Sequence, residues 1–167
     1  LYGNEKGVGT GVHESGIPRE QIFISSKVWN TDQGYDQTLR AFDTSLELLG
    51  METIDLYLVH WPVKGKTKET WRALEKIYID GRARAIGVSN FMVHHLKDLM
   101  EAAEIMPMVH QVELHPYLQL PELQAFTKSN NIQIEAWAPI MKGRVLDIPE
   151  LVTIGEKYGK SAVHVTL

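Results

Sequence analysis

The chain has 167 residues, 44% of them hydrophobic and 23% charged, which is the composition of a globular protein rather than a disordered one. Its formal net charge is −4 with acids and bases interleaved, so we expect neither nucleic acid nor a membrane surface as a partner. The chain has no cysteine, which excludes disulfides and thiol catalysis. No apolar run approaches the roughly 20 residues of a membrane span, and no signal peptide is apparent, so we expect a cytoplasmic protein.

Short apolar runs recur along the chain and predict five strands. They begin at Ile22, Ile54, Ala83, Pro107 and Ile132. Each run is apolar almost throughout instead of alternating with polar residues, which is typical of strands covered on both faces. Strands of that kind occur in parallel sheets.

Helical patterns fill the intervals between these runs. The segment 34–49 carries one apolar stripe and is followed by Gly50, a residue typical of a helix C-cap. Similar stripes lie at 68–80 and 96–103, and Pro121 and Pro149 stand where a first helical turn tolerates proline.

Repeated β/α units without a G-x-G-x-x-G motif favour an α/β fold of the (β/α)₈ TIM-barrel type over a Rossmann domain. Such a barrel typically needs about 250 residues, so 167 residues supply roughly five to six of the eight units. We therefore predict a single partial barrel domain over residues 1–167, without the first strands and without the last strand and C-terminal segment.

The predicted strands end in polar or large aromatic side chains, at the end of the barrel where active sites lie. These residues are Lys27, Trp29, His60, Trp61, Ser89, Asn90, Gln111 and Trp137. Each also has a structural explanation: Ser89 and Asn90 could cap the next helix, Gln111 could satisfy backbone groups, and Trp137 could fill the core.

Several separated motifs resemble the aldo-keto reductase family, in that family's order and over the whole chain. They are "YGNE" at Tyr2, "SKVW" at Ser26, "IDLYLVHWP", "GRARAIGVSNF", "HQVELHPYLQ" and "EAWAPI". The resemblance implies a barrel that reduces aldehydes and ketones to alcohols with NADPH. It also implies a small-molecule carbonyl substrate and a monomer at full length.

The resemblance assigns the catalytic roles. Tyr2 matches the family's proton donor, and Lys27 matches the ammonium that lowers the pKa of that phenol. His60 matches a neutral ring that donates a hydrogen bond to the substrate carbonyl. Trp29 and Trp61 match walls of the substrate pocket; their alternative is plain packing at the barrel top.

The resemblance also assigns cofactor residues. Ser89, Asn90 and Gln111 match the partners of the nicotinamide carboxamide, and Trp137 stands where relatives stack an aromatic ring, usually tyrosine, on the nicotinamide. The loop that follows would wrap the pyrophosphate through Ala138, Pro139, Ile140 and Lys142; relatives often carry serine at the first of these. NADPH rather than NADH is a family expectation that no residue of this chain supports.

The remaining histidines form no H-x-x-x-H or H-E-x-x-H pair, so we expect no metal site. His110 stands where relatives usually carry asparagine, and the sequence suggests no role for it.

Two other hypotheses stay open at this point. Lys27 could be the imine-forming nucleophile of a barrel aldolase. Alternatively, the chain could be a catalytically incomplete barrel fragment with a binding or structural role, because an open barrel exposes strand edges.

Overall fold

The computed structural model describes residues 3–167, in which strands and helices alternate along the chain. The five strands are β1 (Ser25–Val28), β2 (Ile54–Val59), β3 (Ala83–Ser89), β4 (Val109–Glu113) and β5 (Gln133–Trp137). The α-helices are α1 (Glu5–Glu14), α2 (Tyr35–Leu49), α3 (Thr67–Ile79), α4 (Val93–Met100), α5 (Pro121–Ser129), α6 (Pro149–Tyr158) and α7 (Ala162–Thr166). Three 3₁₀ segments complete the list: η1 (Arg19–Gln21), η2 (Asn30–Asp32) and η3 (Met141–Asp147).

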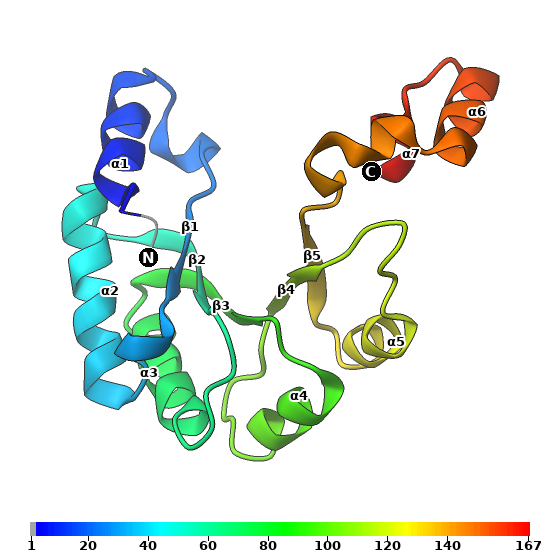
Figure 1. Cartoon of the computed structure of the whole chain (residues 1–167). Coiled ribbons are helices and arrows are strands. Elements are labelled where there is room, and N and C mark those ends of the chain that lie inside the picture. Colours follow the sequence, from blue (N-terminus) through cyan, green and yellow to red (C-terminus); the bar gives the residue numbers. More distant parts are fainter. Residues whose placement is uncertain (1–2) are drawn as a thin grey trace.

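All five strands form one parallel sheet in the order β1-β2-β3-β4-β5, so each strand pairs with the next one along the chain. Helices α2 to α5 follow β1 to β4 and lie along one side of this curved sheet (Figure 1). This arrangement is five consecutive units of a (β/α)₈ barrel and confirms the predicted fold class.

Three predicted strands begin later than expected, the fifth by one residue, at Gln133 rather than Ile132. The first starts at Ser25 rather than Ile22, because Ile22 closes the 3₁₀ turn η1 through a bond from its N–H to the Arg19 carbonyl. The fourth starts at Val109 rather than Pro107. Proline lacks the N–H that a ladder needs, which fits its place outside the strand.

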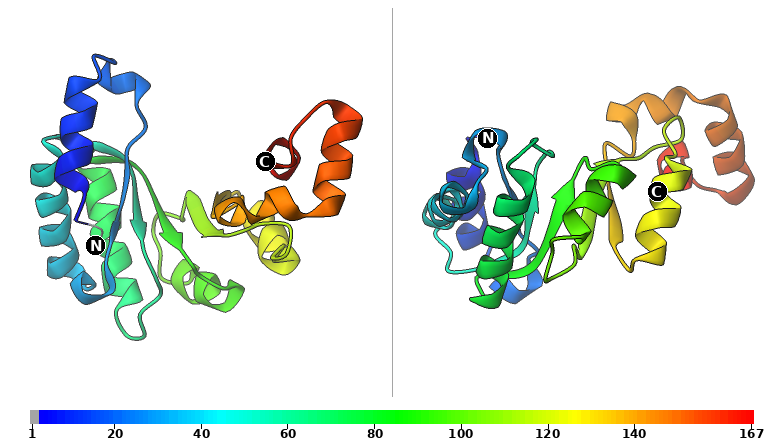
Figure 2. Two further views of the ribbon diagram at one scale, coloured as in Figure 1. Left: turned by 45° about the horizontal axis from the view of Figure 1, so that its top comes forward. Right: turned by 90° about the horizontal axis from the view of Figure 1, so that it is seen from below.

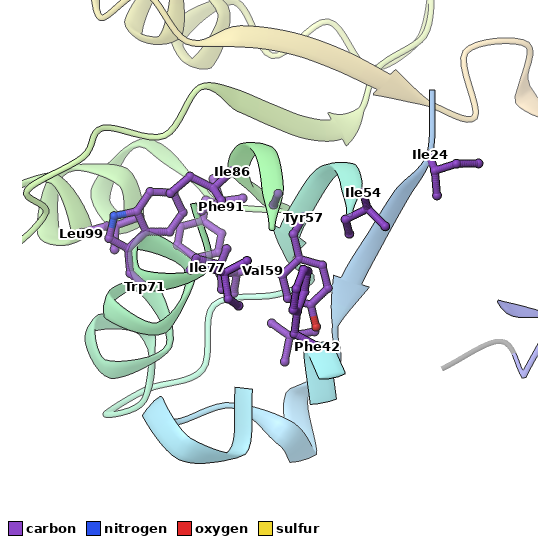
Figure 3. Close-up of a cluster of buried hydrophobic side chains, with 14 of the residues drawn as sticks. Ile24, Phe42, Ile54, Tyr57, Val59, Trp71, Ile77, Ile86, Phe91 and Leu99 are labelled. Atoms are coloured by element: carbon purple, nitrogen blue, oxygen red, sulfur yellow. The ribbon is translucent and has the colours of Figure 1, made fainter. Parts of the chain in front are cut away.

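The helix-facing side of the sheet holds the main core. Tyr57 and Val59 of β2 and Ile86 of β3 are fully buried, together with Phe42 of α2 and Trp71 of α3 (Figure 3). The Phe42 and Tyr57 rings meet edge to face with centroids 4.8 Å apart. Burial of these aromatic rings stabilises the packing of α2 and α3 on the sheet.

The end of α2 shows how the sequence pattern becomes packing. Phe42, Leu46 and Leu49 lie on the predicted stripe and are buried. Gly50 then adopts φ 64°, a left-handed conformation that glycine enters without steric cost, and its N–H bonds back to Glu47 and Leu46.

The opposite side of the sheet is its inner face. Lys27 pairs in register with Leu58, Leu58 with Gly87, Gly87 with Val109, and Val109 with Gln133. Paired residues of neighbouring strands point to the same side, and every second residue along a strand shares that side. The inner face therefore carries Ser25, Lys27, Leu56, Leu58, Gly87, Ser89, Val109, Gln111, Gln133 and Glu135.

The C-terminal part packs as a small cluster of its own. Met141, Val145 and Ile148 are buried there, and the cluster is made by η3, α6 and α7. Figures 1 and 2 show this part beyond β5, away from helices α1 to α3. In residues 3–167 we find no helix whose length and apolar character would let it cross a membrane.

Candidate active site

The predicted site residues gather at one end of the sheet. Because all strands are parallel, their C-terminal ends meet at the same edge. Lys27 lies near the end of β1, His60 directly follows β2, and Ser89, Gln111 and Trp137 lie at or near the ends of β3, β4 and β5. Tyr2, the predicted proton donor, lies outside the described residues.

Lys27 presents a partly buried amine on the inner face. Burial lowers the pKa of Lys27, and the negative charge of Glu135 on β5 opposes that shift. Lys27 and Glu135 belong to strands at opposite edges of the sheet, so their interaction crosses the inner face. Desolvation of an ammonium is a feature of functional as well as structural lysines.

His60 is a buried ring that stands against Trp29. The two ring centroids are 4.8 Å apart and the rings meet edge to face. The backbone N–H of His60 donates to the Val28 carbonyl at 3.3 Å. Burial and, secondarily, the charge of Lys27 lower the pKa of His60 to about 4. The imidazole is therefore neutral near pH 7, the form that the predicted role requires.

The side chain of Asn90 connects the ends of three strands, β2, β3 and β5. Its Nδ2 donates to the His60 carbonyl and to Ser89 Oγ, both at 3.0 Å. Its Oδ1 accepts from Trp137 Nε1 at 2.9 Å. The backbone is left-handed here, with φ 61°, a conformation that asparagine tolerates better than most residues. The side-chain hydrogen bonds stabilise this backbone conformation, together with a hydrogen bond from the Asn90 backbone N–H to the Gln111 carbonyl.

The suggestion that Ser89 and Asn90 cap the next helix is wrong. Helix α4 begins at Val93 with Met92 at its N-cap. Ser89 is almost fully buried at the end of β3, and Asn90 uses its amide within the strand-end network. Both side chains therefore make their hydrogen bonds at the strand ends and do not cap α4.

Hydrogen bonds from neighbouring strand ends hold the side chains of Gln111 and Trp137. Gln111 is 8% exposed, and its Nε2 donates to Glu135 Oε1 at 2.7 Å. Gln111 and Glu135 are register partners, which is why their side chains meet. Trp137 is half-buried, and because its indole N–H is bonded to Asn90, it is more than core filling.

The loop after β5 follows an unusual backbone path. Ala138 and Lys142 both have positive φ, at 52° and 56°. Two backbone hydrogen bonds of 2.9 Å stabilise this path. Met141 N donates to the Ala138 carbonyl, and Gly143 N donates to the Ile140 carbonyl. Ala138, Pro139 and Ile140 are half-buried, and Lys142 is exposed. Their predicted contact with a pyrophosphate stays a prediction.

The two predicted pocket walls differ in their surroundings. Trp29 is half-buried against His60, which brings it into the strand-end group. Trp61 is 42% exposed, and its carbonyl accepts from Gln33 Nε2 at 2.7 Å. The structure therefore brings Trp29 against a predicted catalytic residue, whereas the Trp61 ring reaches solvent.

The sequence reading missed Glu135 and gave no role to His110. Glu135 stands two residues before Trp137, so strand alternation would have put both on the inner face. His110 points the other way, into the helix side, where it is fully buried and its Nε2 accepts from the Phe91 N–H at 3.2 Å. Burial lowers the pKa of His110 to about 4, so this ring is a neutral structural acceptor.

A search of residues 3–167 finds no group of three or more histidine, aspartate or glutamate side chains placed to hold a metal ion. The polar groups at these strand ends are hydroxyl, amide, amine and imidazole groups and the carboxylate of Glu135. Groups of this kind bind and orient an organic ligand through hydrogen bonds.

Comparison with known proteins gives a consistent result. The model of the Aldo/keto reductase family matches residues 1–166. Glyoxal reductase from Bacillus subtilis is 58% identical over 167 residues, covering all of this chain and 60% of that protein. An aldo-keto reductase from a Medee basin deep-sea metagenome superposes with a TM-score of 0.96 at 49% identity, covering 99% of this chain and 62% of that one. A mutant of Gox0644 in complex with NADPH has a TM-score of 0.92 at 43% identity, covering 99% and 60%.

The chain thus spans about 60% of the length of these relatives. The match nevertheless runs through all five strand ends described above, and the family model covers nearly every residue. On this basis the chain belongs to the aldo/keto reductase family.

Proposed function

We propose that these residues are the catalytic part of an NADPH-dependent oxidoreductase that reduces aldehydes and ketones to alcohols. The observation that carries the proposal is the network around Asn90. It ties the backbone of His60, a predicted substrate-side residue, to Ser89 and Trp137, two predicted cofactor residues. A substrate carbonyl and a nicotinamide ring would then be held against one rigid set of strand ends, as reaction between them requires.

The polar groups present suit a nicotinamide carboxamide. That group has one carbonyl acceptor and two N–H donors, and Ser89, Asn90 and Gln111 together offer hydroxyl and amide partners for both kinds. Trp137 offers the aromatic surface beside them. When bound, NADPH would supply the hydride that reaches the carbonyl carbon of the substrate.

The remaining steps fall to side chains of this chain. His60, neutral near pH 7, would donate a hydrogen bond to the carbonyl oxygen and stabilise the negative charge that grows there. The Tyr2 phenol would give that oxygen its proton, helped by the nearby ammonium of Lys27. Trp29 would shield the substrate from water beside His60.

The substrate class follows from chemistry and relatives. The B. subtilis relative is named for glyoxal, a small reactive dicarbonyl. We propose that this protein takes small reactive aldehydes and ketones, works as a monomer at full length, and acts in the cytoplasm.

The test uses the full-length protein. It should quench its tryptophan fluorescence on NADPH addition and oxidise NADPH when glyoxal is supplied. Tyr2→Phe should lower kcat by at least about 100-fold, the scale of general acid catalysis, and leave the Kd for NADPH within about threefold. A protein that neither binds NADPH nor oxidises it with a reactive aldehyde would refute the proposal, and a Tyr2→Phe variant with most of its rate would refute the proton-donor assignment.

A second candidate is a catalytically incomplete barrel fragment with a binding or structural role. One observation favours it: within residues 3–167, the outer edges of β1 and β5 have no further strand beside them. Unpaired edges of this kind recruit another segment or chain. The 167-residue chain by itself would then fail to bind NADPH while the full-length protein binds it; an intact-mass measurement of the native protein identifies which of the two occurs.

A further inference from the structure

Glu135 is a charged side chain on the inner face that the proposed mechanism does not use. It lies on β5 in register with Gln111 of β4, so both side chains point to the same side of the sheet. Gln111 is buried, and its Nε2 lies 2.7 Å from Glu135 Oε1. The pair is thus in close contact at the position where the cofactor amide is proposed to bind.

A carboxylate fixes the orientation of an amide that it contacts. An ionised carboxylate only accepts hydrogen bonds, whereas a glutamine amide has a donor end and an acceptor end. If the Gln111 amide were flipped, two oxygens would face each other at hydrogen-bond distance, and a buried amide would lose its partner. Gln111 must therefore turn its NH₂ toward Glu135, which leaves its Oε1 to accept from a ligand.

Hydrogen bonds also fix the orientation of the neighbouring amide, that of Asn90. Asn90 uses both Nδ2 hydrogens, on the His60 carbonyl and on Ser89 Oγ, and its Oδ1 keeps one free lone pair beside the Trp137 bond. Because Ser89 Oγ accepts from Asn90, the hydroxyl hydrogen of Ser89 remains to donate. The strand ends thus offer two acceptors and one donor, the complement of a primary carboxamide, with Gln111 as the second acceptor.

We propose that Glu135 is a positioning residue that holds the Gln111 amide with its oxygen toward the cofactor, so that the site prefers a ring carrying a carboxamide to one carrying an acetyl group. The inference rests on the proposed function, since the carboxamide is that of the nicotinamide. An acetyl group has a carbonyl acceptor and no N–H, so it cannot use the oxygen that Glu135 exposes on Gln111.

The test compares two cofactors in the full-length protein: NADPH and its reduced 3-acetylpyridine analogue. They share every other group, so the ratio of their Kd values, measured by quenching of tryptophan fluorescence, cancels effects on folding, on phosphate binding and on Lys27. The wild-type protein should bind NADPH about 10- to 100-fold more tightly than the analogue, the size of two hydrogen bonds, one to Gln111 and one to Asn90.

Three substitutions at Glu135 should lower this ratio progressively, from glutamine through leucine to lysine. Glu135→Gln can present either an acceptor or a donor to Gln111, so it should lower the ratio to a value between those of the wild type and of Glu135→Leu. Glu135→Leu removes the acceptor that fixes Gln111 and should lower the ratio about 5- to 10-fold, leaving the contribution of Asn90. Glu135→Lys offers only donors, so the Gln111 amide should flip and the ratio should fall at least as far as in Glu135→Leu. Glu122→Gln, an exposed residue of α5, makes the same charge change as Glu135→Gln and should leave the ratio unchanged.

The outcomes separate the two proposals. A wild-type ratio near one, or a ratio that is the same in the leucine and lysine variants as in the wild type, overturns the role of Glu135 while NADPH binding still stands. A wild-type protein that binds neither cofactor overturns the proposed function and this inference with it.

Discussion

Asp55 offers a test of how the bottom of the sheet is held together. Its carboxylate is 1% exposed, at the end of the sheet away from the candidate site. It accepts three hydrogen bonds of 2.8 Å each, from the Ile24 N–H, from Arg19 Nη2 and from Arg84 Nη1. The three donors come from the segment that leads into β1 and from β3, so one side chain ties both neighbours of β2 together.

The perturbation is Asp55→Asn, which keeps the shape and removes the charge. One oxygen remains as an acceptor, but the new NH₂ group must face a guanidinium donor. Hydrogen bonds to charged groups contribute about 1.5–3 kcal/mol each. The side chains of Arg19 and Arg84 are 34% and 70% exposed. Hydration of these guanidinium groups therefore offsets part of the interaction energy that is lost. We therefore expect the free energy of unfolding to fall by about 2–3 kcal/mol.

The pH dependence of this effect has a defined sign. Burial alone would raise the pKa of Asp55, but the bonds from Ile24, Arg19 and Arg84 outweigh it and lower the pKa. A lowered carboxyl pKa stabilises the fold above the unfolded-state value of about 4 and loses that contribution as the pH falls through the folded-state value. The difference in free energy of unfolding between the wild type and the variant should thus be largest at pH 7 and decrease at acidic pH.

The assay is urea unfolding followed by tryptophan fluorescence, since Trp71 is buried in the core. Asp80→Asn is the matched control: Asp80 makes an ion pair with Lys76 one helical turn away, where both groups reach solvent, and such pairs contribute about 0.5 kcal/mol or less. The reasoning is refuted if Asp55→Asn costs no more than the control, or if its cost is as large at pH 3.5 as at pH 7.

Two further predictions concern histidines. Since the pKa of His110 is about 4 when folded and about 6.5 when unfolded, its contribution of roughly 3 kcal/mol is present above pH 6.5 and is lost between pH 6.5 and 4. His110→Asn keeps an acceptor for the Phe91 N–H but cannot titrate, so urea unfolding should show a shallower loss of stability over that range; an unchanged slope would contradict this. For His60, with a pKa of about 4, the ring C–H signals in NMR should not shift between pH 5.5 and 8, and Lys27→Met should raise that pKa by removing a nearby positive charge. A wild-type titration centred at pH 6 to 7 would contradict the neutral ring.

The strand and helix pattern was readable from sequence because it depends on local periodicity. Apolar runs at Ile54 and Ala83 coincide with the first residues of β2 and β3, and the stripe of 34–49 became α2. The first strand was predicted three residues too early, since an apolar residue such as Ile22 suits a strand and a turn equally. Only the partner strand decides where a ladder begins.

The location of the candidate site was also predictable from the sequence. The parallel topology implies that strand ends meet, and the family motifs supplied roles for Lys27, His60 and Gln111. The orientation of each group was not predictable. Whether Gln111 offers an oxygen or a nitrogen depends on Glu135, which lies 24 residues away in sequence and is brought into contact only by the β4–β5 register.

The sequence by itself determined the α/β class, the succession of β/α units and the residue types that end each strand, because side-chain periodicity and residue chemistry are local properties. The tertiary structure alone decided which polar groups satisfy one another. Asp55, an apparent interruption of a buried strand, is stabilised there by two arginines from distant segments, and His110 by an amide 19 residues earlier. A buried polar group is stable only with a partner, and the fold determines where that partner lies.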